Sequence, residues 1–286
     1  MLVFMLMHAV PGGPFDELKS PLPVAAKANI LHKYGLDKPV WTQYSLYIWH
    51  ALHGDFGIPY ESPTETVLGL IARVWPVTLL LGAIVIAMSF TFGSGMGILA
   101  ALRRDTWLDN LLTFLSTLGY TVPNFIVAIW FIVIFSVRLH WLPTGGWGES
   151  RLLIMPALAY ALQPMAIVAR YTRVAVIEAL VGDYVRTAKA KGLSPGRVVL
   201  RHVLRNALIP IVTLLGPWVP ELFTGSIFIE VTFRIPGLGR FFATSVFQRD
   251  YPMIMATMLL VALLWSIAYL LSDLLYFIID PRMRVG

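Results

Sequence analysis

Few residues of this chain combine a reactive side chain with a setting that points to chemistry. Two carboxylates, Glu221 and Asp273, lie within apolar runs long enough to cross a membrane. A charge at the centre of a bilayer costs about 2.5–3.5 kcal/mol on insertion scales, so such residues often belong to proton relays or ion pathways. In the alternative reading Glu221 faces a hydrated cavity near the outer mouth, and Asp273 pairs with Arg170 or Arg173. The sequence favours the ion pair for Asp273 and leaves Glu221 open.

No catalytic or metal-binding pattern is found among the other residues. The chain has six histidines and no cysteine, and no two histidines stand four residues apart with a glutamate between them. Neither a G-x-S-x-G turn nor a glycine-rich lysine loop for nucleotide phosphates is present. An intramembrane enzyme would need a paired acid, a serine–histidine pair or a metal site, so the sequence favours a protein without chemistry of its own.

The segment Asp183–Pro210 is a strongly basic stretch between two apolar runs. A helix is expected to end at Gly192, and Ser194 with Pro195 suits the N-cap and first position of a second helix. We therefore expect a helix, a tight turn and another helix at the membrane surface. One acid, Asp183, stands against six cations: Arg186, Lys189, Lys191, Arg197, Arg201 and Arg205.

Composition places the chain among membrane proteins. Of its 286 residues, 57% are hydrophobic and 13% charged, and the mean hydropathy is +0.73. A soluble domain cannot bury so much apolar surface in one core, whereas spans of about 20 residues each would use most of this length. The net charge of +6 indicates cationic loops at an anionic inner leaflet rather than binding to nucleic acid.

Five membrane spans are expected, with a kink at Pro123 in the second and several prolines and glycines breaking the fourth. Lys and Arg in the short loops place the basic segment, Arg103 with Arg104, and the C-terminal Arg282 and Arg284 on the inner face. The expected spans are 74–102, 110–137, 152–169, 206–229 and 252–279.

The first 73 residues are expected to be mostly external. Met1–Val10 is apolar but rises only about 15 Å as a helix, so we expect it to be the end of a first span that begins upstream. Residues 24–34 and 40–52 are expected to form two outer helices. Packing on the outer ends of the spans is favoured over a direct substrate role for an aromatic stripe on the second helix, made of Trp41, Tyr44, Tyr47, Ile48 and Ala51.

Several motifs carry a resemblance to a known family. Ala188 and Gly192, with RHVLRNALIP after them, resemble the EAA loop of bacterial ABC importer permeases, in the DYVRTA-x-AKGL variant of the oligopeptide and dipeptide permease family. Arg186 and Thr187 stand where the general EAA pattern has glutamate and alanine. Further motifs resemble the B-type subunit of that family in order and spacing: PGGPF (11–15), HGDFG (53–57), LPTGGW (142–147), TGSIFIE (224–230), PGLGR (236–240), RDYP (249–252) and DPR (280–282).

The resemblance implies an all-α polytopic protein of the bacterial cytoplasmic (inner) membrane, a six-helix type I ABC importer permease with a truncated first helix. Residues 1–73 would hold that partial helix and an outer amphipathic segment, and residues 74–286 the permease core, with the coupling loop at 183–210. The implied partners are a homologous C-type permease, two subunits that bind ATP and Mg²⁺, and an extracytoplasmic binding protein, with lipid around them. No cofactor or metal is implied for this chain.

Two sets of residues are expected to carry function. The first would dock on an ATPase and transmit its closure: Asp183, Tyr184, Arg186, Thr187, Ala188, Lys191 and Gly192. The second, in the broken fourth span, would line the path of the substrate: Pro217, Pro220, Glu221, Thr224, Gly225 and Ser226.

The substrate itself remains open, because relatives of this family carry peptides, glutathione or nickel. An alternative of a different class is a proton-coupled secondary transporter. Such transporters show inverted repeats with matched broken helices, and this chain has one conspicuously broken span. The sequence therefore favours an ATP-driven peptide importer.

Overall fold

A computed structural model describes residues 1–10, 31–32, 35–60, 62 and 64–279, with only the backbone described at 209 and 272–279. Every regular element in the described part is helical. The expected motifs at 11–15 and 280–282, the helix at 24–34 apart from residues 31–32, the cationic tail and the side chain of Asp273 fall outside this description. The elements are α1 (Leu2–Ala9), α3 (Val40–Leu52), α4 (Val67–Leu102), α5 (Trp107–Thr121), α6 (Asn124–Phe131), η1 (Ile132–Arg138), α7 (Ser150–Leu180), α8 (Asp183–Ala190), α9 (Pro195–Val198), η2 (Val199–Val203), α10 (Leu204–Val212), α11 (Leu215–Thr224), α12 (Ile227–Thr232), α13 (Leu238–Gln248) and α14 (Tyr251–Ile279).

The five expected spans correspond to helices or helix pairs of the structure. By length and apolar composition, three single helices in the described part can cross a membrane: α4, α7 and α14. Two bent pairs supply the others, Trp107–Thr121 with Asn124–Arg138 and Pro195–Val212 with Leu215–Thr232. The chain is therefore an all-α, multi-pass protein.

Pro123 does more than kink the second span. The two halves meet at an angle of 102°, a much sharper bend than the expected kink. Pro123 precedes α6 with φ −56°, and Val122 before it is extended at ψ 121°. A proline disfavours the helical conformation of the preceding residue, which ends α5 and lets α6 start in a new direction.

Close packing of α4 on α7 forms the centre of the molecule. Ser89, Gly93 and Gly97 recur every fourth residue on one side of α4, and the Ser89 hydroxyl donates to the Ala161 carbonyl (3.3 Å). A Cβ on Gly93 would lie 2.6 Å from the carbonyl oxygen of Met165, so the two backbones are nearly in contact. Small residues at this spacing allow such an approach, which membrane helices use in place of hydrophobic burial.

Two helices extend beyond the charged residues that were expected to end them. α4 begins at Val67, where the Thr66 side chain accepts from the Gly69 N–H (3.1 Å), so the expected boundary between residues 73 and 74 falls inside a helix. α7 continues beyond Ala169 to Leu180. Arginine is a good helix former, and Arg173 finds a carboxylate partner on α5, Asp109, so its charge does not end the helix.

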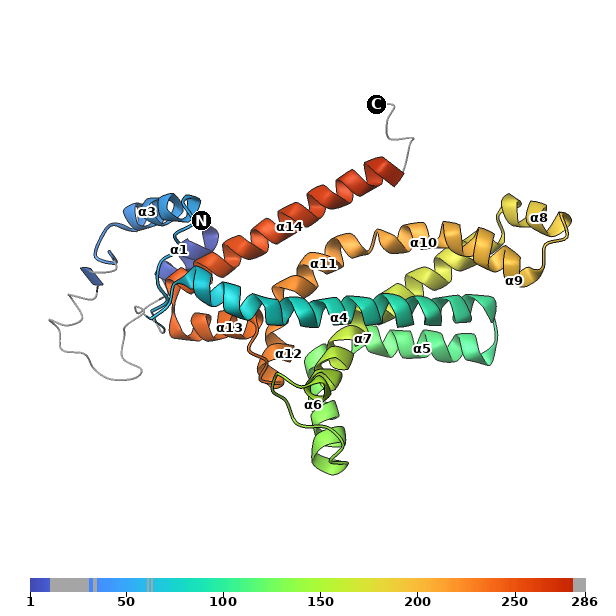
Figure 1. The fold of residues 1–286 in the computed structure, drawn as a ribbon, viewed down its shortest axis with the longest axis horizontal. Helices are drawn as coiled ribbons and strands as arrows, with labels where there is room; N and C mark the ends of the chain where they lie inside the picture. Colours follow the sequence, from blue (N-terminus) through green and yellow to red (C-terminus); the bar gives the residue numbers. More distant parts are fainter. Residues whose placement is uncertain (11–30, 33–34, 61, 63, 280–286) are drawn as a thin grey trace.

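The outer and inner elements lie at opposite ends of the molecule. Figure 1 shows α8, α9 and the turn between α4 and α5 at one end, and α1, α3 and α13 at the other. The basic segment and the turn that holds Arg103 and Arg104 therefore lie at the same end of the molecule, the end expected to face inward. α3 spans the expected residues 40–52 and is followed by Gly54 at φ +80°.

Candidate functional site

At the inner end, a short helix and a turn lie against the ends of the spans. Val185 and Ala188 are buried, three residues apart on one side of α8, and pack in a cluster with Val176 of α7 and Val203 of η2. α9 continues through η2 into α10 as part of one bent span, so the second helix of the expected pair is not a separate element. Apolar contacts thus hold the α8 segment against the start of the bent span, in one cluster with α7.

The expected ATPase-contacting residues divide between the two sides of α8. Ala188 is 4% exposed, so its small side chain serves packing within this chain and is not available for direct contact with a partner. The remaining members of the set are exposed: Asp183, Tyr184, Arg186, Thr187, Lys191 and Gly192. Arg186 and Asp183 lie 3.6 Å apart with both side chains in solvent, so their ion pair adds little stability.

Gly192 has the left-handed conformation expected for it. Its φ is +75°, and its N–H donates to the Lys189 carbonyl (3.0 Å) while the Leu193 N–H donates to the Ala188 carbonyl (3.3 Å). No atom lies within 4 Å of a Cβ built on Gly192. Any cost of replacing this glycine is therefore conformational and not steric. Ser194 occupies the N-cap of α9 with Pro195 after it, as expected, although its hydroxyl makes no capping bond.

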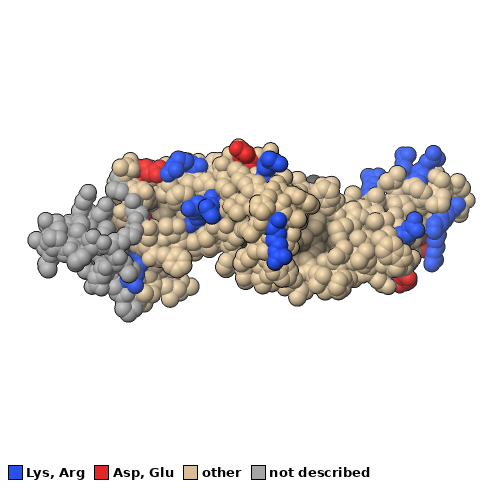
Figure 2. All heavy atoms as spheres, turned by 90° about the horizontal axis from the view of Figure 1, so that it is seen from below, with Lys and Arg blue, Asp and Glu red and all other residues tan. Residues whose placement is uncertain are grey.

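Positive charge gathers at this same end. Figure 2 shows Lys and Arg side chains clustered over the α8 and α9 end of the molecule. Arg197, Arg201 and Arg205 are exposed there. Two large apolar side chains are exposed among the charges, Val181 at 67% and Leu200 at 71%. A surface that mixes exposed apolar and basic side chains suits a protein partner with an acidic rim.

The broken span places the expected path residues in different environments. Pro217 and Glu221 are exposed, four residues apart on one side of α11, and Thr224 follows them half-buried. Pro220 is buried and packs inside the chain. Gly225, at φ +88°, ends α11 and separates it from α12.

The two hydroxyls at the break are engaged locally. Thr224 Oγ1 donates to the Glu221 carbonyl (2.9 Å), and Ser226 Oγ accepts from the Ile229 N–H (3.3 Å). The carbonyl of Phe223, freed by the break, accepts from the Trp75 indole N–H (3.0 Å). Neighbouring elements thus satisfy the interrupted backbone, as required at membrane depth.

Sequence reasoning missed a third carboxylate at this level. Glu230, on α12, is fully buried and accepts from the Thr78 hydroxyl of α4 (2.9 Å). Glu230 is the last residue of the motif TGSIFIE and stands one position beyond the expected span 206–229, so the sequence did not predict a charge within the span here. Its position five residues after a glycine break and seven before another glycine was the available signal.

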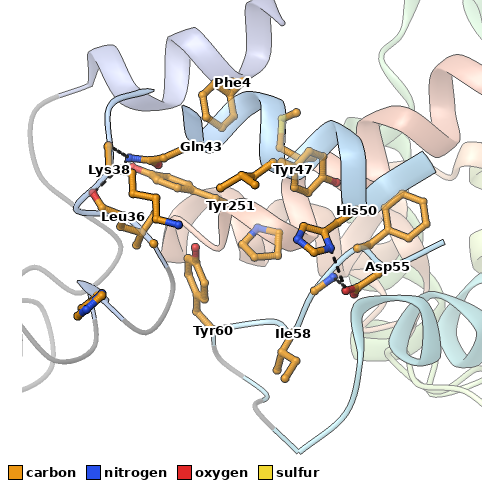
Figure 3. A pocket seen from close by; sticks show the side chains of 17 residues that line it. Phe4, Leu36, Lys38, Gln43, Tyr47, His50, Asp55, Ile58, Tyr60 and Tyr251 are labelled. Atoms are coloured by element: carbon orange, nitrogen blue, oxygen red, sulfur yellow. Dashed lines mark hydrogen bonds and ion pairs between the residues drawn. The ribbon is translucent and has the colours of Figure 1, made fainter. Parts of the chain in front are cut away.

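The aromatic stripe on α3 packs against the outer ends of the spans, as the favoured alternative predicted. The rings of Tyr44 and Phe4 have centroids 5.3 Å apart, and Trp41 alone of the stripe is exposed. Behind the stripe lies a pocket of about 350 Å³ between α1, α3, the segment 55–60 and the start of α14 (Figure 3). His50 Nδ1 and Asp55 Oδ2 are 3.6 Å apart in its wall. Burial raises the pKa of the Tyr47 hydroxyl, which also lines it.

Among the residues that the structure describes, no three His, Asp or Glu side chains come together as a metal site. Two of the histidines make contacts one helical turn away on their own helix. His8 Nδ1 lies 2.9 Å from the Phe4 carbonyl, and His53 Nδ1 lies 2.8 Å from the Trp49 carbonyl.

Comparison with solved structures gives similarity in fold. A chain of the inward-facing MetNI methionine ABC transporter matches with a TM-score of 0.60 at 17% identity, covering 74% of this chain and 97% of that one. A chain of an amino acid ABC transporter crystallised with histidines matches with a TM-score of 0.52 at 16% identity, covering 75% and 94%.

Comparison of sequences gives the family. This chain is 41% identical over 284 residues to the dipeptide transport system permease protein DppB of Bacillus subtilis, covering 99% of this chain and 92% of the relative. It is 38% identical over 283 residues to the oligopeptide transport system permease protein OppB of Escherichia coli, covering 98% and 92%. The family model for the binding-protein-dependent transport system inner membrane component matches residues 93–285. With the helical spans and the surface-exposed α8, these matches show that the chain belongs to the family of binding-protein-dependent transport system inner membrane components.

Proposed function

We propose that this chain forms one half of the path of an ATP-driven peptide importer of the inner membrane, working with a second, homologous permease subunit. The relatives named as dipeptide and oligopeptide permeases match nearly the whole chain, which supports peptides as the substrate class. Glutathione and nickel are the alternative cargoes. Membership of this family favours ATP as the energy source over a proton gradient.

The observation that carries the mechanism is the attachment of α8. Its buried side packs in one apolar cluster with α7 and the bent span, and its exposed side carries Tyr184, Arg186 and Thr187, which would face the cytoplasm. A partner ATPase that binds the exposed side and closes on ATP would move α8 as a rigid lever, because apolar packing transmits displacement to the spans. Two ATPase subunits would bind the ATP and Mg²⁺, one for each permease half, and an extracytoplasmic binding protein would deliver the peptide.

Crosslinking tests this contact directly. The chain contains no cysteine, so a single introduced cysteine is the only thiol of the subunit. Thr187→Cys, on the exposed side of α8, should crosslink to an ATPase subunit in the assembled importer. Ala188→Cys is the matched control, since the neighbouring position is 4% exposed and should not react. Equal crosslinking at both positions, or none at Thr187, would contradict the proposed lever.

Uptake identifies the cargo and the energy source. Proteoliposomes that hold this chain, the second permease and the ATPases should take up a labelled dipeptide when ATP is enclosed and the binding protein is added outside. A proton gradient without ATP should drive no uptake. Uptake of labelled glutathione or Ni²⁺ in place of the dipeptide would reassign the substrate and leave the importer class intact.

A further inference from the structure

Helix α13 begins without a cap of its own. Its N-cap residue is Gly237, which has no side chain to accept from the first N–H groups of the helix. Those groups are satisfied from two other elements. The Leu238 N–H donates to Thr78 Oγ1 of α4 (2.8 Å), and the Arg240 N–H donates to Glu230 Oε2 of α12 (2.9 Å). The start of α13 therefore depends on residues about 160 and 10 positions away in the chain.

Glu230 and Thr78 also bind each other. The Thr78 hydroxyl donates to Glu230 Oε1 (2.9 Å), so the hydroxyl both donates and accepts, and each carboxylate oxygen has a donor. Thr78 is 1% exposed and Glu230 0%. Within the described part of the chain no Lys or Arg forms an ion pair with Glu230; the Arg240 guanidinium instead donates to the Arg234 carbonyl (3.2 Å). The carboxylate is held by the orphan N–H groups at a helix N-terminus, where negative charge is favoured.

Three glycines make room for this carboxylate. A Cβ on Gly237 would lie 2.6 Å from Glu230 Oε2 and 2.6 Å from Thr78 Oγ1, and one on Gly239 would lie 3.1 Å from Oε2. A Cβ on Gly225 would overlap Glu230 Oε1. The same glycine, at φ +88°, makes the break between α11 and α12. Gly225 therefore serves both to break the span and to leave space for the Glu230 carboxylate.

A serine or aspartate at position 237 would cap α13 wherever that helix moved. A cap supplied by Glu230 and Thr78 exists only while α4, α12 and α13 keep their present positions. A buried carboxylate is unfavourable unless its hydrogen bonds are complete. Displacement of any of the three elements would break one of these bonds and would therefore raise the free energy. The arrangement therefore specifies how the three elements sit together rather than the stability of one helix.

This junction adjoins the expected path. A cavity of about 150 Å³ next to it is lined by Thr224 and Gly225 of the break, Gly239 and Phe242 of α13, and Thr257 of α14. α13 lies at the outer end of the molecule, opposite α8 (Figure 1).

We propose that Glu230 is a positioning residue for transport: with Thr78 it locks α12 and α13 to α4 as one unit that holds the outer end of the substrate path. The proposal rests on the proposed importer function. In such an importer the ATPase moves the inner end of the path. If α4, α12 and α13 move as one rigid unit, this motion also reaches the outer end. Loss of the lock leaves the outer end free to open independently of the inner end.

Two substitutions break the lock with little change in shape. Glu230→Gln turns one acceptor into an NH₂ group that faces either the Arg240 N–H or the Thr78 hydroxyl. Thr78→Val removes the hydroxyl, and Thr78→Ser keeps it. Glu149→Gln is the control for loss of a carboxylate, because Glu149 is exposed and its side chain caps nothing.

The distance between α4 and α13 is measured in the assembled importer with a spin label on each helix. The labels are attached to cysteines introduced at Leu68 of α4, which is 51% exposed, and at Thr244 of α13, which is also exposed. The distance distribution should be narrow in the parent, in Thr78→Ser and in Glu149→Gln. It should broaden in Glu230→Gln and Thr78→Val. Leaving one buried donor unpaired corresponds to a factor of about 5 to 150, so dipeptide uptake should fall about tenfold in these two variants, with ATP hydrolysis continuing in the absence of substrate.

A narrow distribution in Glu230→Gln and Thr78→Val would overturn the lock. A broad distribution with normal uptake would overturn the role of Glu230 in transport. Thr78→Val decides the matter if Glu230→Gln does not insert. Absence of dipeptide uptake by the parent would instead count against the proposed function, and the distance measurement would still decide whether the lock exists.

Discussion

Arg173 and Asp109 form a two-pronged salt bridge between α7 and α5. Arg173 Nε donates to Asp109 Oδ1 (2.7 Å) and Arg173 Nη2 donates to Oδ2 (2.8 Å), while the Asp105 N–H donates to the same carboxylate (3.0 Å). The Asp109 side chain is 3% exposed and the Arg173 side chain 28%. Arg170 and Arg173 were both expected as possible partners of Asp273, whose side chain lies outside the described residues, and the structure shows Arg173 paired with Asp109.

Asp109→Ala should destabilise the protein strongly, because a partly buried guanidinium is left without its partner. Removing one member of a buried pair costs about 3–5 kcal/mol, and the remaining exposure of Arg173 places the effect at the lower end. The loss of stability is measured by thermal unfolding in detergent, in which the folded fraction is monitored as the temperature rises. The control is Asp105→Asn, which removes the exposed pair with Arg104 (3.3 Å) and should change stability by no more than about 1 kcal/mol. Equal effects from the two substitutions would show that the buried bridge contributes nothing particular.

Gly97→Ala should separate α4 from α7. A Cβ at this position would overlap the Ala169 carbonyl oxygen and approach Thr172 Cβ to 2.6 Å. Overpacking of this kind costs about 1–3 kcal/mol. Gly95→Ala on the same helix is the matched control, since no atom lies within 4 Å of a Cβ there and alanine favours a helix by about 1 kcal/mol. Thermal unfolding should therefore shift down for the first and stay level or shift up for the second. The same shift for both would contradict the close helix contact.

Gly192→Val should impair coupling without steric conflict. The left-handed conformation costs a side chain about 1–2 kcal/mol, more for a β-branched one, whereas the surroundings of the position are open. Gly196→Val is the control, because Gly196 lies in α9 at negative φ with equally open surroundings. Membrane insertion should be normal in both, and uptake and substrate-stimulated ATP hydrolysis should fall only in Gly192→Val. Unchanged uptake in Gly192→Val would show that coupling does not require this turn.

Exposed positions of α11 should react with a small polar thiol reagent during transport. Cysteines at Pro217 and Glu221 are predicted to react, since both positions are exposed on one side of the helix. A cysteine at Leu222, which is 1% exposed, is the control and should stay protected. The rate of labelling with and without ATP and peptide measures this. Protection of Pro217 and Glu221 in every state of the cycle would place them against lipid or a static partner surface.

The sequence by itself determined the membrane class, the approximate positions of the apolar segments, the helix and turn that end at Gly192, and the helix start at Pro195. These follow from local properties: long apolar runs have to cross a bilayer, Gly192 alone adopts the left-handed turn cheaply, and Pro195 starts a helix. The family followed from short motifs in order. None of these conclusions depends on which helix lies beside which.

Only the tertiary structure decided how the charges and small residues are used. Arg173 pairs with Asp109 because α5 and α7 lie together, and Ala188 points inward because α8 packs in one apolar cluster with α7 and η2. The 102° turn at Pro123 was a kink in the sequence reading, since proline permits either outcome and neighbouring helices choose between them. The role of Glu230 also depends on tertiary structure, so the sequence did not predict it. Its partners, Thr78 and the Arg240 N–H, come from elements far apart in the chain, and a cap assembled across space leaves no periodic signal in the sequence.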